Sequence, residues 1–286
     1  MNNAIQLAAA AAFAIGASQA GAATILDSGT TAYYGADSQK AGDVIGGTQY
    51  QTSQASIVRA GNVLTISINT AFAGYAGTSA GLGRDPFTGR TNKGIGYGDV
   101  FLSDTWNAAG NSTNHYSTDN ANTGTVWDYG FSLDNRWSNT GGTFKLYALN
   151  GATNAQNIVN SDAYITNCYA SQGCNYRENQ ETAVNTTSKT VADTGLSGVW
   201  SVSKNKDTSL STLTFKIDLR GSELLDYSAF AMHWGETCQN DVIEGLATNV
   251  HVPLPGTAAL LALGLGALGV ARRRGRRQVP PGAGAA

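Results

Sequence analysis

Between residues 23 and 250 the chain repeats short runs in which apolar and polar side chains alternate, and no long segment has helical periodicity. The clearest run is residues 210–219, whose apolar members are Leu213, Phe215, Ile217 and Leu219. Side chains of a strand point alternately to its two faces, so this run has one apolar face and one polar face. A chain built of such runs predicts an all-β fold of antiparallel strands, each with one buried face.

A β-hairpin is predicted at residues 56–68, where two alternating runs flank the turn sequence Ala60-Gly61-Asn62. Further strands are expected at residues 99–102, 127–133, 143–149, 198–202 and 228–234. Antiparallel strands with one buried face usually stack as two sheets, which predicts an antiparallel β-sandwich, with a jelly roll as one candidate topology. About 230 residues fit one such domain, so residues 23–250 are interpreted as a single β-sandwich.

The N-terminus has the features of an export signal. An apolar run occupies residues 4–15, and the small residues that follow it include Ala17, Ser18, Ala20 and Ala22. This order predicts a secretory signal peptide at residues 1–22 that is cleaved within residues 20–23. The positively charged start of most signals is missing, since the first basic residue is Lys40. The alternative is a buried alanine-rich helix of the mature fold.

The C-terminus carries three elements in sequence. A short motif comes first and consists of Val252, Pro253, Leu254 and Pro255. Residues 256–271 follow without a charge, and the run ends at Arg272, Arg273 and Arg274. A helix over this run spans about 24 Å, so it crosses a hydrocarbon core of about 30 Å by drawing in flanking residues and by snorkelling of the arginines. We therefore expect one transmembrane helix with its arginines in the cytoplasm and the preceding chain exported.

The ordered motif, apolar run and arginines resemble the PEP-CTERM sorting signal, which exosortase recognises. The family usually has Glu where this chain has Leu254, and residues 278–286 extend beyond the usual end of the signal. The resemblance implies transient insertion in the inner membrane, cleavage near Pro255, and release or attachment at the cell surface. It also implies association with an extracellular polysaccharide matrix, as in a biofilm. A plain anchor that is never cut is the alternative, because one short helix satisfies the same hydropathy.

The chain is thus interpreted as a signal peptide (1–22), an ectodomain (23–250) and a sorting segment (251–286). Five of the 18 basic residues lie in residues 272–277, and without them 13 basic residues stand against 20 acidic ones, a net charge of −7. A body of this sign repels phosphate backbones, so we expect no nucleic-acid partner. With 42% hydrophobic residues the chain is also too apolar for a disordered tail.

The chain has three cysteines. Cys168 and Cys174 enclose only five residues, and a disulfide between them would contribute about 2 kcal/mol by reducing the entropy of the unfolded chain. This pair is the predicted disulfide. Cys238 then remains as a buried thiol or cross-links to a second molecule, unless it pairs with one of the other two.

Two glycine-rich matches to enzyme motifs lack the structural context that those motifs need. Residues 264–269 fit the dinucleotide-binding pattern, but they lie inside the apolar C-terminal run with no acid after them to hold a ribose. Residues 77–81 have the spacing of a nucleophile elbow, with His233 further along the chain. The sequence after Gly81 contains Pro86 and cannot begin a stable helix, so a serine hydrolase is not expected.

The stretch 232–245 concentrates chemistry-bearing side chains. His233, Cys238 and Asp241 offer mixed metal ligands, but no paired spacing supports a metal site. The form of the stretch, an aromatic strand, a polar turn and an apolar strand, resembles a segment common just before the sorting signal in PEP-CTERM ectodomains. We therefore expect a structural role, in which the side chains of Asn240 and Asp241 bond backbone amides of the turn.

Acidic side chains in the loops permit a calcium hypothesis. The residues concerned are Asp99, Asp104, Asp119 and Asp128. Carboxylate oxygens suit Ca²⁺, but the spacing matches no recognisable calcium loop. We predict no metal ion and no cofactor.

The tryptophans next to Asn-rich segments suggest a glycan site. Candidate glycan contacts are Trp106, Trp127 and Trp137, and Tyr116 and Tyr129 lie in similar surroundings. Exposed aromatic rings flanked by amides can stack on sugars, although aromatic rings also fill the cores of β proteins. The sequence thus predicts a non-catalytic exported surface protein. Its alternatives are a carbohydrate-binding module, for which one of these tryptophans would be essential, and a secreted hydrolase, which needs paired carboxylates in one cleft.

Overall fold

Twelve β-strands dominate the described part of the chain in a computed structural model. They are β1 (Ala23–Leu26), β2 (Thr52–Ala60), β3 (Val63–Thr70), β4 (Val100–Ser103), β5 (Tyr129–Leu133), β6 (Gly141–Leu149), β7 (Ile158–Asn160), β8 (Glu181–Val184), β9 (Val191–Ser203), β10 (Ser211–Asp218), β11 (Ala229–Gly235) and β12 (Val242–Thr248). The helices are single turns: α1 (Asn154–Asn157), α2 (Ser161–Tyr164) and the 3₁₀ turns η1 (Thr48–Tyr50) and η3 (Glu223–Leu225).

The structure describes residues 22–27, 44–45, 47–111, 113, 116, 118–166, 175–205 and 211–250. These residues all belong to one compact unit, Gly21–Val252. The predicted signal peptide apart from Ala22, the predicted disulfide, and the sorting motif with its apolar run and arginines lie outside the described residues. Within the described ranges, no helix has the length and apolar character to span a membrane.

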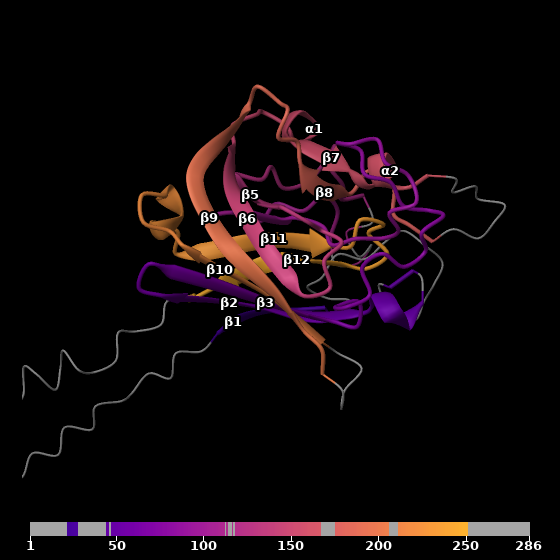
Figure 1. Cartoon of the computed structure of the whole chain (residues 1–286). Coiled ribbons are helices and arrows are strands. Elements are labelled where there is room, and N and C mark those ends of the chain that lie inside the picture. Colours follow the sequence, from indigo (N-terminus) through magenta and orange to yellow (C-terminus); the bar gives the residue numbers. More distant parts are fainter. Residues whose placement is uncertain are drawn as a thin grey trace, which may run out of the picture. The chain divides into compact units, whose positions relative to one another are not determined.

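Ten of the strands form one antiparallel sheet in the order β1-β2-β3-β10-β9-β6-β5-β4-β11-β12. The all-β antiparallel prediction is confirmed, but the two stacked sheets of a sandwich are not what the structure has. The sheet curls until β12 lies against β1 and β2, and the amide of Arg59 donates to the carbonyl of Val250 over 2.7 Å. The result is a nearly closed, barrel-like sheet (Figure 1). Such curling is physically expected, because a twisted open sheet of about ten strands leaves its edges unpaired.

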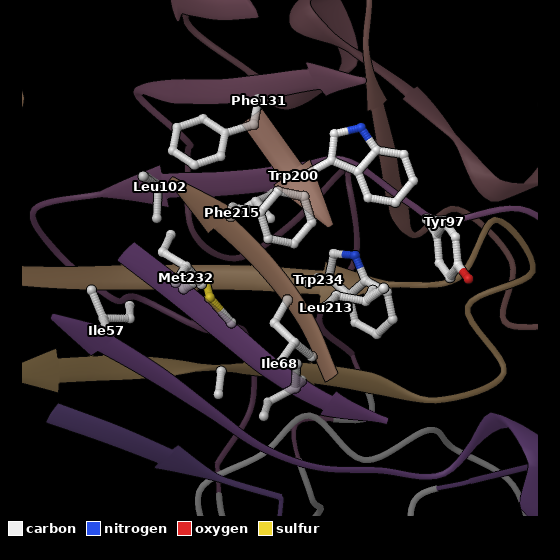
Figure 2. Close-up of a cluster of buried hydrophobic side chains, with 14 of the residues drawn as sticks. Ile57, Ile68, Tyr97, Leu102, Phe131, Trp200, Leu213, Phe215, Met232 and Trp234 are labelled. Atoms are coloured by element: carbon white, nitrogen blue, oxygen red, sulfur yellow. The ribbon is translucent and has the colours of Figure 1, made fainter. Parts of the chain in front are cut away.

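The interior of the barrel collects the apolar faces of the alternating strands. Every second residue of β3 and β10 is buried, and the register pairs Ile66 with Phe215 and Ile68 with Leu213. Phe215 also contacts the rings of Trp200 and Phe144, and Phe144 stacks on Phe131 with ring centres 4.4 Å apart. These aromatic contacts join β5, β6, β9 and β10 in one core (Figure 2).

The predicted hairpin at residues 56–68 is β2 and β3, joined by a turn at Gly61 and Asn62. Gly61 has φ +60° there, which glycine adopts without strain. Each of the other predicted strands overlaps a strand of the sheet. Strands β1, β7 and β8 are short and were not predicted from the alternation pattern.

A second layer covers part of the outer face of the barrel. Strands β7 and β8 pair with each other, and β8 packs on β5 and β11. The apolar side chains beneath this layer are Phe101, Trp127, Leu149, Ile158, Val184 and Ala231. Strands β4 and β11 are therefore buried on both faces, and polar side chains on their outer faces are sealed from water.

Candidate functional site

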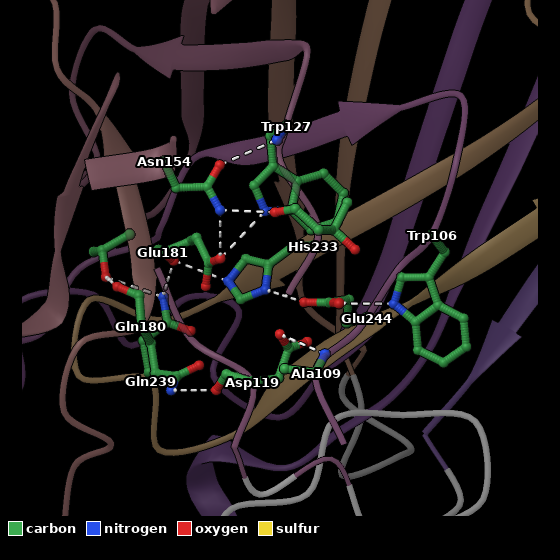
Figure 3. Close-up of polar contacts among 12 residues, drawn as sticks. Trp106, Ala109, Asp119, Trp127, Asn154, Gln180, Glu181, His233, Gln239 and Glu244 are labelled. Atoms are coloured by element: carbon green, nitrogen blue, oxygen red, sulfur yellow. Dashed lines mark hydrogen bonds and ion pairs between the residues drawn. The ribbon is translucent and has the colours of Figure 1, made fainter. Parts of the chain in front are cut away.

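A cluster of four ionisable side chains lies between the barrel and this outer layer, and we call it the His233 cluster. Its members are Asp119, Glu181, His233 and Glu244 (Figure 3). Their exposed fractions lie between 0 and 3%. His233 and Glu244 are direct cross-strand neighbours on β11 and β12, Glu181 begins β8, and Asp119 comes from the segment 104–128 that joins β4 to β5.

His233 is held on both ring nitrogens. Its Nδ1 lies 2.8 Å from Oε2 of Glu244, and its Nε2 lies 2.9 Å from the backbone carbonyl of Glu181. A carbonyl can only accept, so Nε2 carries a proton in this geometry. The ring also packs against Phe101 and Trp127, which keeps it in a fixed orientation.

Glu244 is the centre of the cluster. Besides His233, it accepts a 2.7 Å hydrogen bond at Oε1 from Nε1 of Trp106, and its carboxyl is hydrogen-bonded to that of Asp119. Burial raises the pKa of Glu244 to about 7. Burial raises the pKa of Asp119 to about 9, and the neighbouring Glu244 adds to that shift. Two carboxyl groups in contact can be stable in a buried site when they share a proton.

Glu181 lies on the other side of His233. Its Oε1 accepts from Nε1 of Trp127 over 3.3 Å and from Nδ2 of Asn154 over 3.1 Å, and its backbone carbonyl also accepts from Nε2 of Gln239 over 2.7 Å. Burial raises the pKa of Glu181 to about 8. Neutral donors rather than a cation thus satisfy this carboxyl.

The side chains of the cluster are of the types that carry out acid–base chemistry, but they are not exposed to solvent. It could move protons among its own members, as general acids and bases do. All four side chains are almost completely buried in this structure. Among the described residues, no three His, Cys, Asp or Glu side chains come together as ligands for a metal ion.

The hypothetical metal ligands of the stretch 232–245 point to different places. His233 belongs to the His233 cluster. Cys238 is a buried free thiol of the barrel core, and burial raises its pKa. Oδ2 of Asp241 accepts from the amide of Thr52 over 2.6 Å. The structure does not assemble these three side chains into one site.

The side chains of Asn240 and Asp241 hold the polar turn between β11 and β12 through partners outside the turn. Asp241 does bond a backbone amide, but that amide belongs to β2 and not to the turn. Asn240 donates through Nδ2 to the carbonyl of Asn175. Within the turn the amide of Gln239 donates to the carbonyl of Glu236 over 2.8 Å, and Arg177 donates to the carbonyls of Gln239 and Asn240.

The aspartates of the calcium hypothesis divide among three places, with the amide of Asp104 donating to Oδ2 of Asp128 over 3.4 Å. Asp99 pairs with Arg136 over 3.0 Å, and Asp119 belongs to the His233 cluster. Asp128 accepts at Oδ2 from Oγ of Ser103 over 2.8 Å and from the hydroxyl of Tyr227 over 3.0 Å. Their carboxylates stabilise segments of the fold.

The candidate glycan contacts differ in exposure. Trp127 is fully buried and offers no surface to a sugar. Trp106 is half-buried, with its indole N–H on Glu244 and its ring against Tyr116. Trp137 is half-buried, donates to the carbonyl of Gly94 and lies beneath the ammonium of Lys93.

Residues 77–81, which have the spacing of a nucleophile elbow, do not form one. Ser79 of this sequence hydrogen-bonds Tyr50, which is not a catalytic base.

Sequence reasoning identified His233 but not its partners. The Glu181 carbonyl is 52 residues away along the chain, and the Trp106 indole is 138 residues from Glu244. One signal was available: Glu244 is the last acidic residue of the chain and lies in an otherwise apolar strand. A carboxyl at such a position indicates a buried polar partner.

Comparison with known families gives one match, outside the described residues. Residues 251–277 match the family model of the PEP-CTERM protein-sorting motif. No curated protein and no solved structure matches the chain. The resemblance drawn from the C-terminal residues is thus confirmed.

Proposed function

We propose that this chain is a non-catalytic protein of the cell surface or extracellular matrix. It carries a PEP-CTERM protein-sorting motif, which implies that it is exported and processed by exosortase. The motif at residues 251–277 is the observation that carries this proposal. Its finer steps are cleavage of a signal peptide near residue 22, transient insertion of residues 256–271 in the inner membrane, and cleavage near Pro255.

Burial of the acid and base groups supports the non-catalytic part of the proposal. A hydrolase of polysaccharides needs two carboxyl groups about 5 to 10 Å apart at an open cleft. In the His233 cluster, Asp119 and Glu244 are instead in hydrogen-bond contact and sealed from solvent. The secreted hydrolase is therefore the weakest of the three alternatives.

The export proposal can be tested by cell fractionation. Replacing Arg272, Arg273 and Arg274 with Gln removes the charges that stop transfer at the membrane. We expect the precursor to leave the inner-membrane fraction and to escape processing. The control is Arg220→Gln, which removes an exposed arginine of the barrel that pairs with Asp218. An unchanged distribution of the triple variant would contradict the proposal.

We propose that the uncovered outer face of the barrel contacts the polysaccharide. Adjacent strands align short hydroxyl side chains there in a row, with Ser56 beside Ser67, Ser67 beside Thr214 and Thr214 beside Ser201. Such short side chains leave the surface open to hydrogen bonding by an extended sugar chain.

A groove of about 240 Å³ crosses β5 and β6 on this face. Its outward-pointing lining is Ser132, Asp134, Thr143, Lys145 and Tyr147. It combines a half-buried aromatic ring with hydroxyl, carboxylate and ammonium groups, and such combinations recognise one face and the edge of a sugar ring. The acidic body favours a neutral glycan over an anionic one.

Calorimetric titration with neutral oligosaccharides tests the groove. Asp134→Asn keeps the shape of the side chain but removes its charge, and we expect at least tenfold weaker binding. Asp85→Asn, a partly exposed carboxylate of the loop between β3 and β4, is the matched control and should bind as the native protein does. Loss of binding on Trp106→Ala or Trp137→Ala alone would instead favour a carbohydrate-binding module centred on that tryptophan. Absence of binding by every glycan on an array would contradict both sites.

A further inference from the structure

We infer that the His233 cluster is a proton-held latch, which fixes segment 104–128 against the barrel and releases it when the cluster loses protons. Two side chains of the segment end on the same carboxyl group of the barrel. Trp106 donates to Oε1 of Glu244 over 2.7 Å, and Asp119 hydrogen-bonds the same group. This inference does not depend on the proposed export or on the glycan site.

The balance of charges in the cluster requires bound protons. The titratable groups that meet there are Asp119 from segment 104–128, Glu181 from β8, His233 from β11 and Glu244 from β12. Their other hydrogen-bond partners are neutral indoles and amides from Trp106, Trp127, Asn154 and Gln239. A single imidazole ring can carry at most one positive charge to balance one carboxylate, and isolated buried charges are costly. Two of the three carboxyl groups are therefore held as acids.

The shared proton between Asp119 and Glu244 is the part that links the segment to the barrel. While Asp119 is protonated, its O–H can donate to Glu244, which also binds His233. Loss of that proton places two carboxylates in contact in a buried site, where like charges repel strongly. The repulsion acts between segment 104–128 and β12, so it pushes the segment away from the barrel.

Other contacts set how far the segment can open. The amide of Ala109 donates to Oδ1 of Asp119 over 3.1 Å, so residues near 109 depend on the position of that carboxyl. The end of the segment is held separately, because Nδ2 of Asn154 donates to the carbonyl of Thr125 over 2.7 Å and Trp127 is buried. Nε2 of Gln180 also donates to the backbone carbonyl of Asp119 over 3.1 Å. Opening should therefore affect residues 105–111 and leave residues 119–128 in place.

The pKa shifts place the transition in mildly alkaline solution. Burial holds the pKa of Glu244 near 7 and that of Asp119 near 9. In the unfolded chain both groups titrate near pH 4, so the protons that folding retains are lost as pH rises through the folded values. The latch is therefore tightest near pH 4, weakens as the pH rises, and has lost its bound protons above about pH 9.

Hydrogen exchange of the full-length protein tests the latch. Exchange is measured from pH 6 to pH 10 and corrected for its intrinsic pH dependence. We expect amide protection within residues 105–111 to fall at least tenfold, while protection in β3 and β10 changes less than twofold. Asp119→Asn offers an amide donor to Glu244 that cannot titrate, so in this variant the fall should disappear. Constant protection in the native protein, or the same fall in Asp119→Asn, would overturn the inference.

A measurement without substitution guards against a variant that fails to fold. Infrared spectra of the native protein at pH 7 should show the carbonyl stretch of protonated carboxylic acids, and this band should vanish on unfolding at the same pH. Absence of the band from the folded protein at pH 7 would exclude bound protons in the cluster and overturn the inference.

Discussion

Asp99 shows how one buried side chain can connect several strands. Its Oδ1 accepts from Arg136 over 3.0 Å and from the amide of Leu133 over 3.1 Å, and its Oδ2 accepts from the amide of Val184 over 2.8 Å. All these partners donate to the carboxylate and oppose the effect of burial, which raises the pKa of Asp99. Arg136 in turn donates to the carbonyl of Tyr97. The pair joins the ends of β5 and β8 to the start of β4.

Asp99→Ala should strongly destabilise the fold. It removes one partner of a buried ion pair and leaves the charge of Arg136 and two backbone amides unsatisfied, which costs about 3 to 5 kcal/mol in the free energy of unfolding. Asp193→Ala is the control, because the pair of Asp193 with Lys145 is largely exposed to solvent. Urea unfolding should show a large fall in midpoint for the first variant and almost none for the second. Equal midpoints would contradict the assigned role of Asp99.

At the scale of elements, the sequence predicted strands best where one face of the strand is exposed to solvent. In β3 and β10 the burial alternates strictly, so the pattern and the structure agree. In β4 every residue is buried because the outer layer covers its second face, and β8, which belongs to that layer, is also buried along its whole length. Glu181–Val184 therefore shows no alternation, and Ile158–Asn160 has only three residues, so neither carried a strand signal.

The closest packing in segment 104–128 is at Gly124. Gly124 has φ +87°, and a Cβ there would lie 1.6 Å from Oδ1 of Asp119. Gly61 also has a positive φ, but nothing lies within 4 Å of its Cβ position. The two glycines thus separate the cost of backbone strain from the cost of a clash.

Gly124→Ala should destabilise the protein more than Gly61→Ala. The Gly61 variant carries only the strain of a left-handed backbone, about 1 kcal/mol, whereas the Gly124 variant adds overpacking of about 1 to 3 kcal/mol. Chemical unfolding of both variants measures the difference. If the two substitutions cost the same, Gly124 does not pack against Asp119 as described.

At the scale of the whole molecule, alternation indicates that a face is buried but not what buries it. A second sheet and the far side of the same curled sheet satisfy the same pattern, so the sequence led to a sandwich where the structure has a nearly closed barrel. The closure depends on contacts of β12 with β1 and β2, which are separated by about the full length of the described chain. The His233 cluster depends on other long-range contacts, to Glu181 and Trp106, which are 52 and 138 residues from their partners and were likewise beyond the reach of local patterns.

The barrel also divides its outer face between two roles. Strands β4, β5 and β11 carry the outer layer and the His233 cluster, whereas β2, β3, β10 and β9 present rows of hydroxyl groups to solvent. The first part stores buried protons and stabilises the fold. The second is the part that we propose to face the polysaccharide.

Mass spectrometry of both termini tests export and processing most directly. It is done on protein recovered from the cell surface and from the medium. The proposed route predicts a mature chain that begins near Ala23 and ends near Pro255, without the apolar run and its arginines. Full-length chains that end at Ala286 on surface-displayed protein would contradict cleavage by exosortase.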